Sequence, residues 1–123
     1  MLKLAREREE LRVVDDEFIL PTSTDQIARQ IVALVGSTGY GLYHGTAKGS
    51  CSWYEFPAEI FATTGTKVCL EKARPGEFPM NVNRPKYFVL EDCALKKAQL
   101  NLFADWREGL HQYLAARAQT GAS

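Results

Sequence analysis

Three helix-start signals divide this sequence into helices and the segments between them. In each signal, a Ser or Asp that can cap a helix N-terminus is followed three positions later by Gln or Glu. The first side chain can accept a hydrogen bond from a backbone amide of the first helical turn, and the second can reach back to the capping residue. The pairs are Ser23 with Gln26, Ser52 with Glu55, and Asp105 with Glu108.

Apolar residues follow each signal at helical spacing, which predicts three helices. Ile27, Ile31 and Leu34 share one face of the first helix, which is expected to end near Val35. Gly65 suits the end of the second helix, since glycine adopts the left-handed conformation of a C-terminal cap. The second helix is expected to carry Trp53, Phe56 and Ile60, and the third Trp106, Leu110, Tyr113 and Leu114.

Short apolar segments between the helices predict strands. They lie at residues 13–14, 41–47 and 67–72, and a further short helix is expected near residues 93–100. Residues 73–86 contain three prolines and predict a long loop. The alternation predicts an α/β fold with a few short strands and about four to five helices, and no complete Rossmann domain.

Composition excludes several classes of protein. The chain has 123 residues, with 15 Lys and Arg against 15 Asp and Glu, so it lacks the net positive charge typical of nucleic-acid binding. No apolar run approaches the ~18 residues of a membrane span, and the charged N-terminus does not resemble a signal peptide. Cys51, Cys69 and Cys93 are odd in number and without a Cys-x-x-Cys motif, which favours reduced thiols and a cytoplasmic location.

The sequence lacks the established motifs for cofactor binding and catalysis. The glycines of "GSTGYG" (residues 36–41) follow a predicted helix, whereas a dinucleotide loop precedes one. The lysine of "GTAKGS" lacks the spacing of a phosphate-binding loop. His44 and His111 are the only histidines and have no evident metal-binding partners, and no tyrosine is followed four residues later by lysine. The sequence therefore predicts no catalytic residue and no metal ligand.

Two stretches have the character of ligand-binding loops, although solvated surface explains them equally well. "VVDDEFILPT" places acidic and aromatic residues directly after a strand, where ligands bind in open α/β sheets. "NVNRP" ends the long loop with Arg84, whose planar guanidinium suits a phosphate.

Five motifs, in order along residues 1–117, resemble those of the dTDP-4-dehydrorhamnose reductases, members of the extended short-chain dehydrogenase group. The family has approximately "L-x-V-V-D-D-Q-x-G-x-P-T", "G-x-Y-H", "S-W-Y-E-F-A-x-x-I-F", "R-P-x-x-S-x-L" and "D-W-R-E-A-L-x-x-Y-L". This chain has "LRVVDDEFILPT", "GLYH", "CSWYEFPAEIF", "RPKYFVL" and "DWREGLHQYL". The resemblance covers the C-terminal part of the family.

In that family, an N-terminal part carries the glycine fingerprint and the catalytic Tyr-x-x-x-Lys pair, and the C-terminal part helps to bind the dTDP-sugar. The reaction is hydride transfer from NADPH to the 4-keto group of a dTDP-6-deoxyhexulose. The resemblance implies a substrate-binding domain at residues 1–118 with a frayed tail at 119–123, and no cofactor held by this chain. It implies these substrate contacts: Asp16, Glu17, Phe18, Pro21, Thr22 and Arg84.

The chain departs from the family pattern in the loops assigned to substrate. Glu17 replaces Gln, Ile19 replaces Gly, and Phe88 replaces Ser. Glu17 adds negative charge where a nucleotide is expected, which weakens the binding of an anion. The motifs of the predicted core are kept more closely than those of the loops.

Two hypotheses follow for the function. The chain is expected to be a sugar-nucleotide-binding portion of a reductase, inactive alone, whether as a truncated product, an excised piece or half of a split enzyme. The alternative is a non-catalytic remnant that acts as an interaction or dimerisation module, since the surface that packs on the other domain would be exposed and apolar. The expected partners are a dTDP-sugar, a second copy or the nucleotide-binding half, with no nucleic acid and no membrane.

Overall fold

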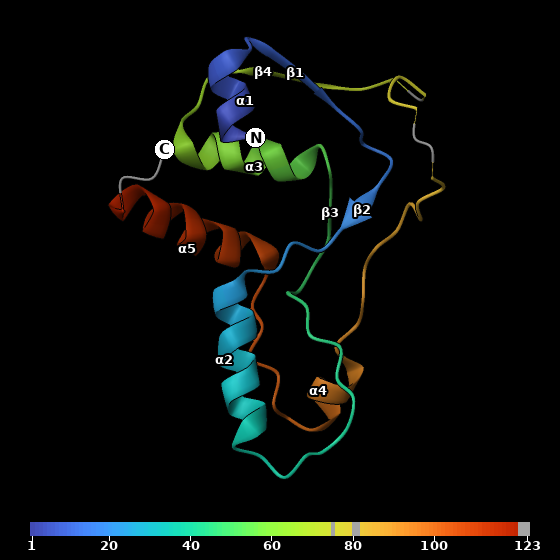
Figure 1. The fold of residues 1–123 in the computed structure, drawn as a ribbon, viewed down its shortest axis with the longest axis vertical. Coiled ribbons are helices and arrows are strands. Elements are labelled where there is room, and N and C mark those ends of the chain that lie inside the picture. Colours follow the sequence, from blue (N-terminus) through green and yellow to red (C-terminus); the bar gives the residue numbers. More distant parts are fainter. Residues whose placement is uncertain (75, 80–81, 121–123) are drawn as a thin grey trace.

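A computed structural model describes residues 1–74, 76–79 and 82–120 (Figure 1). Its five helices and four short strands, counted over these residues, confirm the predicted α/β class. The tail expected at residues 119–123 begins inside the last helix, and residues 121–123 lie outside the described part, so the domain boundary stays a prediction. In chain order the elements are α1 (Leu2–Glu7), β1 (Glu10–Val13), β2 (Phe18–Ile19), α2 (Thr24–Val35), β3 (Cys51–Ser52), α3 (Glu55–Thr64), β4 (Cys69–Lys72), α4 (Cys93–Lys97) and α5 (Trp106–Gln119).

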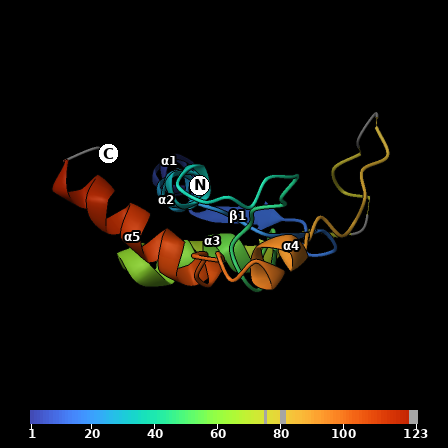
Figure 2. The same ribbon diagram turned by 90° about the horizontal axis from the view of Figure 1, so that it is seen from below.

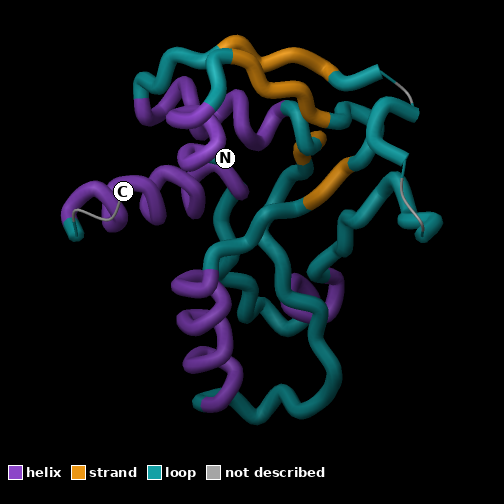
Figure 3. The backbone as a smooth tube through the Cα atoms, turned by 45° about the horizontal axis from the view of Figure 1, so that its top comes forward, coloured by secondary structure: helices purple, strands orange, loops and turns teal. Residues whose placement is uncertain are grey.

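The strands form two small sheets of two strands each. β1 pairs in parallel with β4, with Leu11 opposite Leu70, and β2 pairs antiparallel with β3, with Phe18 opposite Ser52. Figure 3 shows the β1–β4 ribbon along one edge of the molecule, above the helices. Because β1 and β4 run in the same direction, the chain leaves both strands at the same end.

Local capping explains where the predicted helices begin. Ser52 Oγ accepts the amide of Glu55 at 3.1 Å, and Glu55 Oε2 accepts the amide of Ser52 at 3.2 Å, so this capping box is complete. Ser23 Oγ accepts the amide of Gln26 at 3.3 Å, and Asp105 accepts that of Arg107 at 3.0 Å. The helix starts predicted at Ser23 and Asp105 are confirmed, and the Ser52–Glu55 pair forms as predicted although α3 itself begins later.

α3 differs from the prediction at its first turn and agrees with it at its end. The helix begins at Glu55, so Trp53 lies in the turn before it instead of on a helix face. The amide of Trp53 donates to the carbonyl of Glu17 at 3.2 Å, which keeps this residue beside β2. Gly65 ends the helix with φ of +68°, as predicted.

The core lies between α3 and α5. Trp106 is 1% exposed, and its ring packs edge-on against Phe56 with centroids 6.1 Å apart. Leu110 and Leu114 of α5 and Ile60 and Phe61 of α3 complete the contact, and Leu11 joins it from β1.

The strand predicted at residues 41–47 is wrong. The structure assigns no strand there, and only Lys48, just beyond it, forms an isolated bridge with Asp105. The residues have the alternating apolar pattern of a strand, but within the described part of the chain no other strand lies beside them. Leu42 is 86% exposed as a result. Strand formation depends on a partner that local sequence does not supply.

None of the helices in the described ranges has the combination of length and hydrophobicity needed to cross a lipid bilayer.

Candidate functional site

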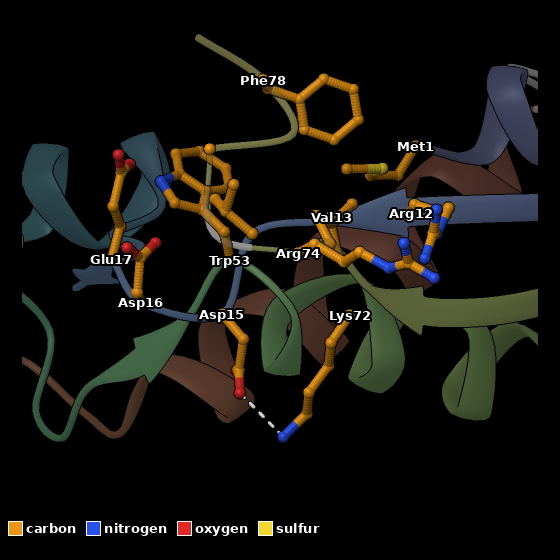
Figure 4. A pocket seen from close by; sticks show the side chains of 13 residues that line it. Met1, Arg12, Val13, Asp15, Asp16, Glu17, Trp53, Lys72, Arg74 and Phe78 are labelled. Carbon is orange, nitrogen blue, oxygen red and sulfur yellow. Dashed lines mark ion pairs between the residues drawn. The ribbon is translucent and has the colours of Figure 1, made fainter. Parts of the chain in front are cut away.

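An open pocket of about 600 Å³ lies where β1 and β4 end (Figure 4). The chain leaving β1 contributes Asp15, Asp16 and Glu17, and the end of β4 contributes Lys72 and Arg74. The aromatic side chains of Trp53 and Phe78 also line it. A pocket at the carboxyl ends of parallel strands is the usual location of ligand sites in α/β folds.

Asp15 connects three segments below this pocket. Its Oδ1 accepts the hydroxyl of Ser52 at 2.6 Å, and its Oδ2 lies 2.7 Å from Nζ of Lys72. The hydrogen bond from Lys72, followed by that from Ser52, lowers the pKa of Asp15, and the same contact raises the pKa of Lys72. Both side chains are therefore charged at neutral pH, and each compensates the charge of the other.

Arg12 fixes another wall of the pocket. Its guanidinium forms ion pairs with Glu77, in the segment after β4, and with Glu71. These contacts hold the Glu77 segment, and with it Phe78, against β1. The positive charge of Arg12 is consequently compensated inside the protein.

Glu17 and Arg74 are the charged groups most available to a ligand. Neither forms an ion pair with another residue in the described part of the chain, whereas Asp16 lies 3.3 Å from Lys86. Figure 4 shows Asp16 and Glu17 beside Trp53 on one side of the pocket, with the Arg74 side chain extending toward the other. Trp53 is 37% exposed and Phe78 54%, so both rings remain open to contact. The pocket thus offers hydrogen-bond acceptors at one end, a cation at the other and aromatic surface between them.

The structure divides the six predicted substrate residues among several places. Asp16 and Glu17 line this pocket. Phe18 lies in β2 with its ring centroid 6.1 Å from that of Tyr87. Arg84 is exposed in the loop that precedes Tyr87. It lines neither this pocket nor the second pocket described below.

Pro21 and Thr22 line a second pocket, of about 740 Å³, between the start of α2 and α5. Thr22 has a structural use there, because its hydroxyl accepts the amide of Ala47 at 3.0 Å and donates to the carbonyl of Leu20 at 3.2 Å. The structure thus brings only two of the six predicted residues into the first pocket.

Sequence reasoning missed Trp53, Lys72, Arg74 and Phe78. Trp53 precedes α3, whereas Lys72, Arg74 and Phe78 lie at the end of β4 and in the segment after it, so they meet only through the β1–β4 pairing and the position of α3. One signal was available: "EKAR" spans the end of a predicted strand, as "VVDD" does, and if the two strands were parallel the basic residues would meet the acidic ones at one edge.

The cysteines and histidines do not gather into a reactive centre in the part of the chain that is described. Cys51 is fully buried, and burial raises the pKa of its thiol to about 12. Such a thiol is protonated at neutral pH and unreactive as a nucleophile. His111 lies in α5 with Nε2 2.8 Å from Oε1 of Glu59. Over the same described residues, no group of three or more His, Cys, Asp and Glu side chains could hold a metal ion.

The described residues form a small α/β domain with an open pocket lined by charged and aromatic side chains. The RmlD substrate binding domain family matches residues 1–119, and the chain belongs to this family.

Curated relatives agree with this membership. The chain is 37% identical over 118 residues to the spore coat polysaccharide biosynthesis protein SpsK of Bacillus subtilis, covering 96% of this chain and 41% of that protein. It is 37% identical over 125 residues to the dTDP-4-dehydrorhamnose reductase of Escherichia coli K12, covering 93% of this chain and 42% of that one. The chain therefore spans about two fifths of the length of these relatives.

Solved structures show the same fold. A dTDP-4-dehydrorhamnose reductase from Clostridium acetobutylicum matches with a TM-score of 0.88 and 37% identity, covering 94% of this chain and 41% of the other. One from Bacillus anthracis, in complex with NADP, matches with a TM-score of 0.87 and 33% identity and the same coverage of the two chains. The resemblance proposed from the five motifs is confirmed.

Proposed function

We propose that this chain is the substrate-binding portion of a dTDP-4-dehydrorhamnose reductase, and that the pocket at the ends of β1 and β4 holds the dTDP-sugar. Family membership supports the class of ligand. The observation that carries the location is that Glu17, Trp53 and Arg74, from three separate segments, line one open pocket.

The chemistry of the pocket suits the two ends of a sugar nucleotide. Carboxylates accept hydrogen bonds from hydroxyl groups, so Asp16 and Glu17 would bind the sugar. The guanidinium of Arg74 can donate two parallel hydrogen bonds to a phosphate, so it would bind the diphosphate. The carboxylates repel phosphate, which orients the ligand with its anionic part toward Arg74. Trp53 and Phe78 supply the aromatic surface that small-molecule sites commonly use.

The described part of this chain does not fit a dinucleotide cofactor. A pyrophosphate binds where a helix begins, because backbone amides and the positive end of the helix dipole meet there. Gly36, Gly39 and Gly41 instead follow the end of α2, at the negative end of its dipole. NADPH bound by another domain would supply the hydride for the 4-keto carbon of the sugar. The role of this chain would be to hold that sugar, so we expect no NADPH oxidation by the chain alone.

Tryptophan fluorescence tests the site. Trp53 is partly exposed in the pocket and Trp106 is 1% exposed in the core, so added dTDP should change the emission of Trp53 only. We expect a saturable change that disappears in Trp53→Phe. Arg74→Gln should weaken dTDP binding about tenfold, which corresponds to about 1.4 kcal/mol.

Arg29→Gln is the matched control, since Arg29 is an exposed arginine that lines the second pocket instead. Weaker binding in Arg29→Gln with normal binding in Arg74→Gln would place the ligand in the wrong pocket. No emission change at millimolar dTDP would contradict the binding itself. Turnover of NADPH with the keto-sugar by the pure chain would contradict the proposal that another domain must bind the cofactor.

A further inference from the structure

The segment after β4 supplies two of the side chains that line the pocket, Arg74 and Phe78. The amide of Ala73 donates to the carbonyl of Val13 at 2.7 Å, which extends the β1–β4 pairing by one residue. Beyond Ala73, the structure assigns no helix or strand to the described residues before α4. Figure 2 shows this segment, in yellow, projecting from the end of the molecule opposite α5. The position of Phe78 therefore depends on contacts made by side chains.

One ion pair connects this segment to the body of the protein. Nη1 of Arg12, in β1, donates to Oε1 of Glu77. For residues 76–79 and 82–85, no other hydrogen bond or ion pair reaches a residue outside the segment. The contact between Arg12 and Glu77 is thus the polar anchor of this part of the chain.

A tight turn transmits the anchor to both pocket residues. The amide of Glu77 donates to the carbonyl of Arg74 at 3.0 Å. Gly76, between them, has a φ of +78°, which favours glycine because it has no Cβ. Glu77 is therefore bonded to the backbone of Arg74, and Phe78 is the next residue along the chain. We call Arg74 and residues 76–78 the Glu77 turn.

The ion pair is partly buried, and its removal would release the turn. The side chain of Arg12 is 35% exposed and that of Glu77 is 23% exposed. Nε of Arg12 and Oε2 of Glu77 are buried and accept or donate no hydrogen bond in the described structure. A charge left there without its partner is unfavourable, so the turn would move to return it to water.

We propose that Arg12 and Glu77 are positioning residues of this pocket, and that their ion pair holds Arg74 and Phe78 where a sugar nucleotide meets them. This inference rests on the proposed function, in which Arg74 binds the diphosphate. A turn that is fixed in advance needs no ordering when the ligand binds, whereas an unanchored turn must be ordered, which lowers affinity. Arg12 also lines the pocket, but Glu77 and Glu71 compensate its charge, so it acts through Arg74.

Titration of the complete chain with dTDP, followed by the emission of Trp53, tests the proposal. Glu77→Ala should weaken dTDP binding about fivefold, because the turn must then be ordered on binding. Glu71→Ala is the matched control, since Glu71 also pairs with Arg12 but lies in β4 and does not hold the turn. We expect its affinity to stay within about twofold of the unmodified chain, as for an exposed pair. Arg12→Lys should keep most of the affinity, because Arg12 donates one hydrogen bond to Glu77 and an ammonium can replace it.

A double substitution shows whether Glu77 acts through Arg74. In the otherwise unmodified chain, Arg74→Gln is expected to weaken dTDP binding about tenfold. In the Glu77→Ala background the same change should cost less than about threefold, because an unanchored turn no longer presents Arg74 to the phosphate. The full loss in both backgrounds would show that the two residues act independently and would overturn the proposal.

Backbone dynamics test the same contact without any ligand. The heteronuclear Overhauser effect of an amide falls when that amide becomes mobile on the picosecond-to-nanosecond timescale. We expect lower values at Gly76 and Phe78 in Glu77→Ala, and unchanged values in Glu71→Ala. Glu77 lies outside the helices and strands, so both variants should keep the circular dichroism of the unmodified chain.

The outcomes separate this proposal from the proposed function. Lower Overhauser values in Glu77→Ala, with no binding of dTDP to the unmodified chain, would contradict the sugar-nucleotide site and leave the anchoring role of Arg12 and Glu77 supported. Unchanged values in Glu77→Ala would overturn the proposal even if dTDP binds. Tighter binding of dTDP by Glu77→Ala would also overturn it, because Arg12, once released, would then bind the phosphate directly.

Discussion

The carboxylate of Asp15 lies 2.7 Å from the ammonium of Lys72, and this ion pair joins the ends of the parallel strands β1 and β4. Asp15 also accepts the hydroxyl of Ser52 at 2.6 Å, in β3 just before α3. The three segments that supply the pocket are thus held together by one side chain. The position of Glu17 and Trp53 relative to Arg74 depends on it.

Removal of this charge should loosen the pocket. We expect Asp15→Asn to destabilise the protein by about 1 kcal/mol, below the ~1.5–3 kcal/mol of a buried charged hydrogen bond because Lys72 is largely exposed. Asp16→Asn is the control, since the Asp16–Lys86 pair is exposed on both sides and should contribute under ~0.5 kcal/mol. Urea unfolding of both variants measures the difference; equal midpoints would show that Asp15 has no such role.

The same pair predicts a dependence of stability on pH. The pKa of Asp15 is lowered in the folded protein, so its contribution is present above the unfolded value of ~3.9 and is lost as the pH falls through the folded pKa. The pKa of Lys72 is raised, so the contribution is complete below ~10.4 and is lost as the pH rises through the folded value. The gap in unfolding free energy between the unmodified protein and Asp15→Asn should therefore be constant near pH 7 and should narrow as the pH falls below ~3.9. A gap that did not narrow with acidification would assign the effect to something other than charge.

The three thiols should differ in reactivity. Cys51 is buried, with its pKa raised to about 12, whereas Cys69 and Cys93 are exposed. Iodoacetamide at pH 8 should modify two cysteines quickly and Cys51 only after denaturation, because the thiolate is the reactive form. Peptide mass spectrometry identifies the sites. Rapid labelling of Cys51 in native protein would show that the segment containing β3 opens readily.

The two tryptophans should contribute differently to stability. Trp106 is 1% exposed between α3 and α5, and its replacement by Ala should cost about 3–5 kcal/mol through lost burial and the cavity that remains. Trp53→Ala should cost under ~1 kcal/mol, since Trp53 is 37% exposed. Chemical unfolding followed by circular dichroism compares them. Similar losses would mean that the core does not centre on Trp106.

The parts of this fold that follow from short-range chemistry were predictable from the sequence. Ser52 and Glu55 satisfy each other within one turn, and Gly65 supplies a positive φ that other residues rarely adopt, so the ends of α3 are encoded locally. The prediction of a strand at residues 41–47 was wrong because a strand forms only beside a second strand, which the local sequence does not supply. Ile31, Val32 and Val35 of α2 have the helical spacing of a core-facing stripe, yet all three are exposed. Spacing alone does not tell which face of a helix is buried.

The pocket could not be predicted from local sequence alone, because it is formed by segments that are distant along the chain. Glu17 and Arg74 are far apart along the chain, and only the parallel pairing of β1 with β4 brings them to one edge. Pro21 and Thr22 follow Glu17 closely in sequence, but β2 carries the chain away, so they face α5. The guanidinium of Arg84 suits a phosphate, but Arg74 has the same chemistry and is the arginine that lines the pocket.

The most direct test of the sugar-nucleotide site is a map of backbone amide shifts as dTDP is titrated into the isolated chain. The account predicts that the largest shifts cluster at residues 15–17, at Trp53 and at residues 72–74. Shifts centred on Pro21, Thr22 and α5, or no shifts at saturating millimolar dTDP, would contradict it.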